Sequence, residues 1–136
     1  MRPTDYIASL FKPSGGPGEE PAAYDFDPIS SYFYNRSAEE EALQTIDAET
    51  TADLDLNAVF EQIDRTTSRV GQQYLYARLR TLRGEEDAAD FDRRVGVFEN
   101  DDELTQRCAG HLARLSSDDA YDFQRLIFDT PVKVRR

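Results

Sequence analysis

The side chains best suited to nucleophilic catalysis or metal binding are few in this sequence. His111 is the only histidine, and Cys108 is the only cysteine. A structural zinc site needs about four ligands at short spacings, and a catalytic nucleophile needs a base beside it. His111 has no second ligand at metal spacing, so we expect it to be a half-buried structural residue. Cys108 has no partner for an internal disulfide, and we expect a small core residue there.

An acid, a base and three hydroxyls come together in the run Asp64-Arg65-Thr66-Thr67-Ser68. Such a group suggests catalysis, but no histidine, cysteine or glycine-rich loop is near it. The better interpretation is a helix boundary, because a hydroxyl side chain satisfies the unpaired N–H groups of a first helical turn. We expect Thr66 or Thr67 to cap the following helix, and Asp64 and Arg65 to fix the angle of the corner. The other carboxylates fall at predicted helix starts and on solvent faces, so we expect no catalysis by this chain alone.

The longest patterned stretch runs from Leu54 to Leu82 and predicts two helices around this corner. Apolar residues recur at helical spacing before and after it: Leu56, Val59, Phe60 and Ile63, then Val70, Tyr74, Leu75, Leu79 and Leu82. Gly71 lies inside the second helix, where glycine costs about 1 kcal/mol relative to alanine. We expect close approach of another helix to compensate for it.

The remaining segments complete an all-α fold, a helical bundle of about five helices with an irregular N-terminal extension. Pro28 is expected to prevent a helix over residues 24–36. A short helix is predicted near 38–47 and a loop over 48–54. Gly84 is expected to end the long helix, and further helices are predicted up to Asn100, over 101–115 and near 121–128.

The corner and the helices after it resemble the start of the helical core domain (domain III) of the MutS family of mismatch-repair ATPases. The matching residues are Ile63, Asp64, Arg65, Thr66, Ser68, Gly71, Leu75, Leu79 and Leu82, followed by the runs at 92–95, 97–100, 101–115 and 122–126. The resemblance covers roughly the second half of the chain, and it is closest to divergent MutS-related proteins.

This resemblance implies a non-catalytic lever within a longer ATPase, one that couples ATP state to DNA binding. It implies three parts, namely an extension over 1–36, a MutS-like core over 37–130 and a truncated tail over 131–136. The expected structural corner is Asp64, Arg65, Thr66 and Gly71, and the expected packing residues are Phe60, Ile63, Leu75, Leu79, Val95 and Phe98. ATP and magnesium would be bound by the parent protein, and we expect no cofactor in this segment.

Several parts of a complete MutS protein are missing from the sequence. No GxxxxGK[ST] loop is present to hold phosphates, and no phenylalanine is followed by glutamate two residues later, as in the mismatch-reading element of the repair enzymes. The net charge of −11, from 16 basic and 27 acidic residues, disfavours unaided binding to DNA or to an anionic membrane. We therefore expect DNA contact only through the parent protein.

Composition leaves several alternatives open. The acidity fits either a salt-adapted organism or an ordinary acidic protein. We expect a cytoplasmic protein, because neither a signal peptide nor an apolar run of about 20 residues is present. The expected partners are the rest of the parent chain and a second copy, through Leu104, Leu112 and Leu115 or through Tyr32–Tyr34. The alternative is a stand-alone acidic helical module that binds a basic protein.

Overall fold

The fold is all-α, as the sequence predicted. The computed structural model describes residues 24–36 and 42–128. These residues form seven α-helices, two short 3-10 helices and one pair of two-residue strands. None of the described helices combines the length and the apolar character needed to cross a membrane.

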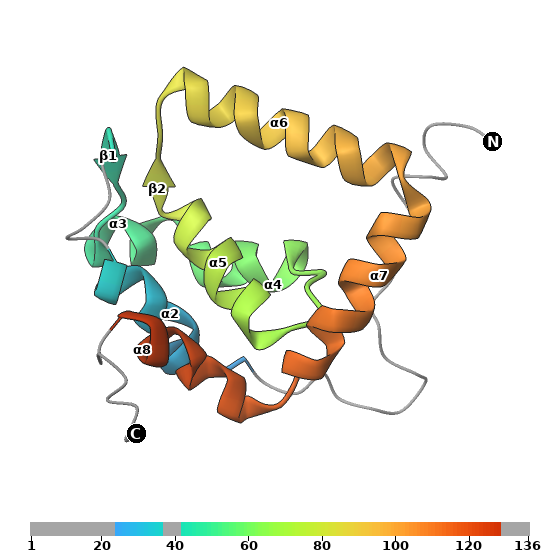
Figure 1. Ribbon diagram of the computed structural model, residues 1–136. Coiled ribbons are helices and arrows are strands. Elements are labelled where there is room, and N and C mark those ends of the chain that lie inside the picture. The colour runs from blue at the N-terminus through green and yellow to red at the C-terminus, as the bar shows by residue number, and fades with distance from the viewer. Residues whose placement is uncertain (1–23, 37–41, 129–136) are drawn as a thin grey trace, which may run out of the picture.

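The elements form a compact cluster and an arm (Figure 1). In chain order they are α2 (Phe26–Arg36), β1 (Gln44–Thr45), α3 (Ala48–Asp53), α4 (Leu56–Ile63), α5 (Arg69–Leu79), β2 (Thr81–Leu82), α6 (Glu85–Asn100), α7 (Asp102–Leu112), η1 (Ala113–Leu115), η2 (Asp118–Asp122) and α8 (Phe123–Phe128). Helices α2 to α5, with η2 and α8, make up the cluster. Helices α6 and α7 leave the cluster after β2 and return to it at η1, and we call these two helices the arm.

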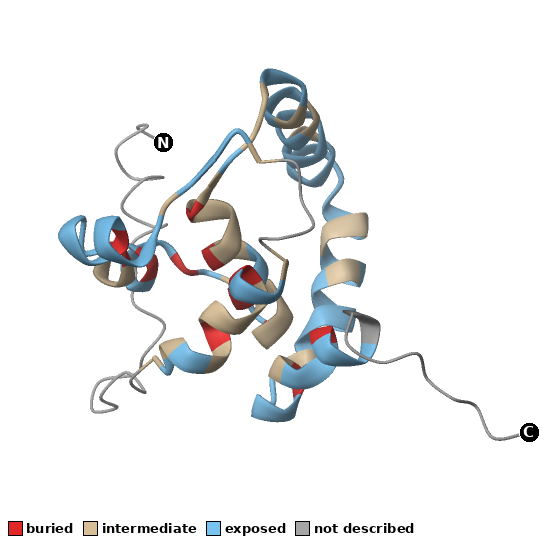
Figure 2. Cartoon of the chain, turned by 90° about the vertical axis from the view of Figure 1, so that its left-hand side faces the viewer, coloured by how far each residue is buried: buried red, intermediate tan, exposed pale blue. Residues whose placement is uncertain are grey.

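The core lies where α2, α4 and α5 meet. At its centre three buried side chains pack together, one from each helix: Ile29, Phe60 and Tyr76. The rings of Phe60 and Tyr76 meet edge-on with 5.5 Å between their centroids, a favourable geometry for aromatic pairs. Figure 2 shows that the buried residues gather in the cluster, whereas α6 has none.

Helix α2 corrects the prediction of an irregular segment over residues 24–36. Pro28 is the third residue of this helix. The first turn of a helix has no intrahelical acceptor for its N–H groups, so proline is tolerated there. The carboxylate of Asp25 accepts a hydrogen bond from the N–H of Asp27 at 3.2 Å. Pro28 therefore lies in the first turn of α2 and does not block the helix.

The helix predicted near 38–47 is also wrong where the structure describes it; residues 37–41 lie outside the described range. Strand β1 pairs with β2 in antiparallel register, with Gln44 opposite Leu82 and Thr45 opposite Thr81. The predicted loop over 48–54 is instead mostly helix α3. Asp47 caps that helix, because its carboxylate accepts a hydrogen bond from the N–H of Thr50 at 2.7 Å. This cap satisfies an unpaired N–H of the first turn and fixes the start of the helix.

The long helix after the corner ends earlier than predicted. Helix α5 stops at Leu79, because the chain then turns into β2. Gly84 is not its C-terminal stop. Gly84 precedes α6 as the N-cap residue, with φ −65°, and this conformation is open to any residue. The pairing of β2 with β1 therefore decides where α5 ends.

Candidate functional site

The corner between α4 and α5 is built around the buried carboxylate of Asp64, which is 8% exposed. Its Oδ1 accepts hydrogen bonds from the N–H of Thr66 at 2.9 Å and from the Thr66 hydroxyl at 2.7 Å. Its Oδ2 accepts from Nε2 of Gln72 at 2.9 Å. Arg65 donates to the backbone oxygen of Asp64 at 2.7 Å. Asp64 thus joins the end of α4, the turn and the first turns of α5.

Ser68, not Thr66 or Thr67, is the N-cap of α5. The Ser68 hydroxyl oxygen accepts from the N–H of Gly71 at 3.0 Å. The Thr66 hydroxyl is already used, because it donates to Asp64. The predicted capping role was therefore assigned to the wrong hydroxyl within the right segment.

Gly71 is required by the corner itself and not by another helix. A Cβ added at this position would lie 2.9 Å from the Ser68 hydroxyl oxygen and 3.1 Å from Cβ of Thr66. Both distances are shorter than ordinary contacts, and the Ser68 oxygen is fixed by its capping bond. The missing side chain thus lets the corner fold back on the first turn of α5.

Two buried glutamines of α5 connect the corner to the rest of the cluster. Gln72 accepts from the Tyr121 hydroxyl at 2.6 Å. Gln73, 1% exposed, donates to the backbone oxygens of Pro28 at 2.8 Å and Tyr121 at 3.0 Å. These bonds join α2, α5 and η2. No pattern in the sequence predicts these bonds, because polar residues in a helix are expected on its solvent face.

Arg80 was likewise missed, and it is 1% exposed. Its guanidinium donates to the Ile46 oxygen from Nε at 3.2 Å and from Nη2 at 2.9 Å, and to the Tyr34 hydroxyl at 3.1 Å. The guanidinium carbon also lies 4.0 Å from the ring centre of Phe33 and 5.7 Å from that of Tyr76. Arg80 therefore holds the chain before α3 against α2 and the end of α5.

The residues predicted to form the packing core divide into two groups. Phe60 is fully buried, and Leu75 and Leu79 pack against the central cluster. Ile63, Val95 and Phe98 lie outside it, with 39%, 38% and 44% of their surfaces exposed. Ile63 is the last residue of α4, and the other two belong to the arm, so their positions lie beyond the meeting point of α2, α4 and α5.

The arm is attached to α5 at both of its ends. At the α6 end, Arg78 pairs with the Asp87 carboxylate at 2.9 Å, and its guanidinium carbon lies 4.1 Å from the ring centre of Phe91. Past the α7 end, Arg69 pairs with Asp118 at 3.0 Å. Neither α6 nor α7 contributes a buried residue. The arm is thus fixed at its ends and exposed along its length.

An open, mainly apolar groove of about 490 Å³ lies between α5 and α6. It is lined by Tyr74, Phe91, Arg94, Val95, Phe98 and Glu99, and we call it the arm groove. Its four aromatic or aliphatic side chains are each between 38% and 45% exposed. This contiguous surface is suited to receiving another apolar element.

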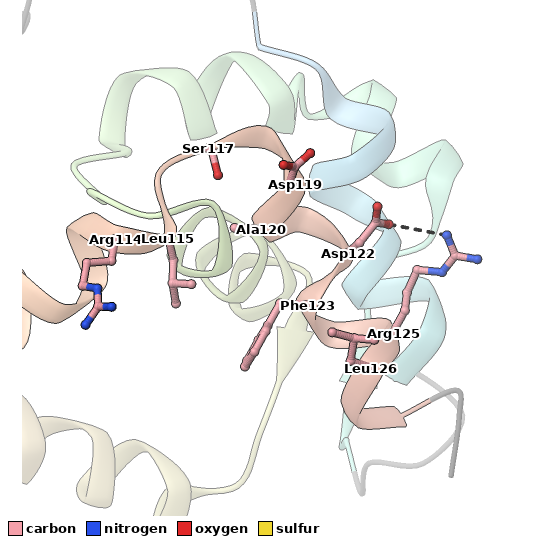
Figure 3. Close-up of a pocket in the computed structure, with 9 residues that line it drawn as sticks. All are labelled: Arg114, Leu115, Ser117, Asp119, Ala120, Asp122, Phe123, Arg125 and Leu126. Atoms are coloured by element: carbon pink, nitrogen blue, oxygen red, sulfur yellow. Dashed lines mark hydrogen bonds and ion pairs between the residues drawn. The ribbon is translucent and has the colours of Figure 1, made fainter. Parts of the chain in front are cut away.

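A second open groove of about 590 Å³ follows η1, η2 and α8 (Figure 3). Leu115 and Phe123 point to one side of it in this view, and Asp119 points to the other. Asp122 is engaged with Arg125 at 3.4 Å. The lining of this groove contains neither histidine nor cysteine, and its one hydroxyl side chain is Ser117.

Burial shapes the electrostatics of three tyrosines in the cluster. It raises the pKa of Tyr24, Tyr76 and Tyr121 above the ordinary tyrosine value. The neighbouring Asp64 carboxylate raises the pKa of Tyr24 further. In the folded state these hydroxyls hold their protons more strongly than free tyrosine does.

His111 and Cys108, the side chains best suited to chemistry, both lie on α7. His111 is exposed on α7, so the prediction of a half-buried histidine is wrong, and Cys108 is only partly buried. Within the described residues, no group of three or more His, Cys, Asp or Glu side chains could hold a metal ion. The candidate functional features are therefore the corner and the arm.

No protein-family model, curated protein or solved structure matches the chain. The corner, the arm and the arm groove are therefore the features from which a function can be inferred.

Proposed function

We propose that this chain is a non-catalytic helical core segment of a MutS-related DNA mismatch repair ATPase. It would act as a lever that couples the ATP state of the parent protein to DNA binding. ATP, magnesium and DNA would be bound by other parts of that protein. The observation that carries the proposal is the corner around Asp64.

The corner supports the proposal because the residues that resemble the MutS family have defined structural roles there. Asp64 accepts three hydrogen bonds, Thr66 donates two of them, and Ser68 caps α5. Gly71 leaves the space that the turn needs. Residues that set the angle between two helices determine the geometry of a lever, so a shared corner sequence favours a shared mechanical role.

The attachment of the arm supports the same role. A displacement of α6 would reach α5 through the contacts of Arg78 with Asp87 and Phe91. A displacement beyond α7 would reach it through Arg69, Gln72 and the hydroxyl of Tyr121. Helices that shift as rigid units are a common device of conformational coupling.

The first test is the coding sequence beyond Arg136. A continuous reading frame with a GxxxxGK[ST] loop is the expected result, and a frame that ends without one would overturn the proposal. The second test uses the full-length protein and the variant Arg78→Met, which weakens the attachment of the arm. We expect the effect of ATP on DNA affinity to fall about fivefold, a typical size for allosteric coupling.

The matched control for that variant is Arg93→Met. Arg93 also pairs with a carboxylate, at 2.8 Å from Asp90, but its side chain is 72% exposed and this partner belongs to the arm itself. We expect this variant to keep the effect of ATP on DNA affinity. An equal loss of coupling in both variants would count against a lever that acts through the arm.

A second candidate is a stand-alone acidic helical module that binds a basic protein. The observation in its favour is the exposed apolar lining of the arm groove within a chain of net charge −11. A reading frame that ends without the phosphate loop, together with a folded and monodisperse chain in solution, would favour this module over the lever.

A further inference from the structure

A row of unpaired acids follows one flank of α6. Glu85, Asp92 and Glu99 are spaced seven residues apart, and seven residues are close to two helical turns. The three side chains therefore align along the helix. All three are exposed, and none forms a hydrogen bond or ion pair with another described residue.

On the other flank of α6, Asp87 and Asp90 are already held in ion pairs. Asp87 pairs with Arg78 at 2.9 Å and lies 3.8 Å from Arg83. Asp90 pairs with Arg93 at 2.8 Å and also with Arg94. The two flanks of the helix thus differ, because one offers free negative charge and the other offers closed ion pairs.

An apolar stripe separates these flanks. Phe91, Val95 and Phe98 follow one another at spacings of four and three residues, and they place their side chains on one face of the helix. This stripe is one wall of the arm groove, and Tyr74 of α5 lies on the other. Residues beside such an apolar stripe commonly carry the charges that select a partner helix.

We propose that the arm groove binds a basic amphipathic α-helix from outside these 136 residues. The apolar stripe of that helix packs on Phe91, Val95 and Phe98, and its lysines or arginines lie opposite Glu85, Asp92 and Glu99. This inference rests on the proposed function, in which the lever packs against further helices. It deepens that function by naming the chemistry of one such helix.

Charge disfavours a second copy of this chain as the occupant. Two antiparallel α6 helices would bring the row of Glu85, Asp92 and Glu99 against the same row of the other copy, and like charges across an interface are unfavourable. In the parallel arrangement the row would face a flank whose charges are already paired. Neither arrangement neutralises the free acids, whereas a basic helix does.

The test measures binding of two labelled synthetic peptides to the full chain by fluorescence anisotropy. Both peptides are helical, as long as α6, and carry a leucine stripe. One has lysine and the other glutamate at seven-residue spacing beside the stripe. We expect the lysine peptide to bind at least about tenfold more tightly, because charge complementarity governs the choice of partner.

Matched variants separate the groove from general attraction to an acidic protein. Asp92→Lys combined with Glu99→Lys should weaken lysine-peptide binding at least about tenfold, the effect of roughly 1.4 kcal/mol. Glu49→Lys combined with Asp53→Lys makes the same change in net charge on α3 and should change affinity less than about twofold. Equal losses in the two double variants would overturn the proposal.

A second pair of variants tests the apolar stripe. Val95→Ser combined with Phe98→Ser should abolish peptide binding, whereas Val97→Ser should preserve it, because Val97 is 49% exposed and is not part of the groove lining. Two other occupants of the arm groove would each overturn the proposal. The first is a second copy of this chain, which would be identified by a dimer that Val95→Ser combined with Phe98→Ser converts to a monomer.

The other occupant is a segment of this chain itself. The sequence before α2 contains the apolar pair Leu10 and Phe11. Tighter peptide binding in a Leu10→Ser, Phe11→Ser variant would show that these residues compete for the groove. These outcomes are distinct from failure of the lever proposal. A reading frame without a phosphate loop would remove the ATPase and leave the selectivity of the groove for the lysine peptide unchanged.

Discussion

The guanidinium carbon of Arg80 lies 4.0 Å from the ring centre of Phe33, inside a site where Arg80 is only 1% exposed. A buried charge is costly unless polar groups surround it. Here the Ile46 oxygen accepts two hydrogen bonds and the Tyr34 hydroxyl accepts a third. The charge of Arg80 therefore has polar partners on α2 and on the residue that follows β1.

Arg80→Lys should destabilise the fold by about 2 kcal/mol or more, even though the charge is kept. Lysine cannot reproduce the planar fork that serves the Ile46 oxygen and stacks on aromatic rings. The free energy of unfolding is measured by urea denaturation followed by circular dichroism. Arg107→Lys, at an exposed position of α7, is the control and should change it by less than about 0.5 kcal/mol.

Glycine-to-alanine substitutions should act in opposite directions at two helical positions. Gly96→Ala should stabilise the protein by up to about 1 kcal/mol, the usual helix-propensity difference, because nothing lies within 4 Å of its added Cβ. Gly71→Ala should destabilise it, because its Cβ would meet Ser68 and Thr66. Thermal unfolding of the two variants gives the comparison, and a stabilised Gly71→Ala protein would contradict the close contact at the corner.

Asp64→Ala should lower the free energy of unfolding by about 2–3 kcal/mol, the cost of leaving buried polar groups without partners. The substitution removes the acceptor for Thr66 and Gln72. Asp53→Ala serves as the control because Asp53 is exposed at the end of α3. Similar losses in both variants would mean that the hydrogen bonds of Asp64 add little stability.

Arg78→Met should loosen the arm while the cluster stays folded. Arg78 contributes an ion pair and a cation–π contact, together worth about 1 kcal/mol, so local opening of α6 should increase about fivefold. Amide hydrogen exchange measures this in the first turns of α6, with α5 as the internal reference. Uniform acceleration in both helices would show that the arm does not open on its own.

Stability should fall in alkaline solution because burial raises the pKa of Tyr24, Tyr76 and Tyr121. A raised folded-state pKa gives stability that is fully present below the unfolded value, near 10. This stability is lost as pH rises through the folded-state pKa. Absorbance at 295 nm and circular dichroism should therefore report ionisation and unfolding together. Tyr76→Phe should reduce the alkaline loss of stability, and Tyr74→Phe, at an exposed position, should leave it unchanged.

The sequence predicted the elements whose apolar residues recur at helical spacing. Helices α4 and α6 begin and end close to the predicted residues, because their apolar spacing and end signals depend only on residues near in sequence. Helix α2 was missed because Pro28 is tolerated only in a first turn, and the sequence does not show where a turn begins. Strand β1 was missed because its conformation depends on distant residues, namely Arg80 and β2.

The candidate site was located more accurately than it was explained. The sequence predicts a corner over the run from Asp64 to Gly71. The structure shows that Ser68 is the cap of α5, and that Thr66 and Ser68 leave no room for a side chain at Gly71. Buried Gln73 and Arg80 could not be anticipated, because their partners come from segments far away in sequence. The exposure of Val95 and Phe98 also depends on tertiary structure, since periodicity shows an apolar face but not what covers it.

The arm is an excursion of the chain between two elements that contact each other directly, α5 and η2. The entropy of closing such an excursion grows only with the logarithm of its length, about 0.6 kcal/mol for each doubling. Adding one turn to a helix extends it by about 5.4 Å. The reach of the arm can therefore lengthen or shorten in steps of one turn during evolution, while the sequence of the cluster stays the same.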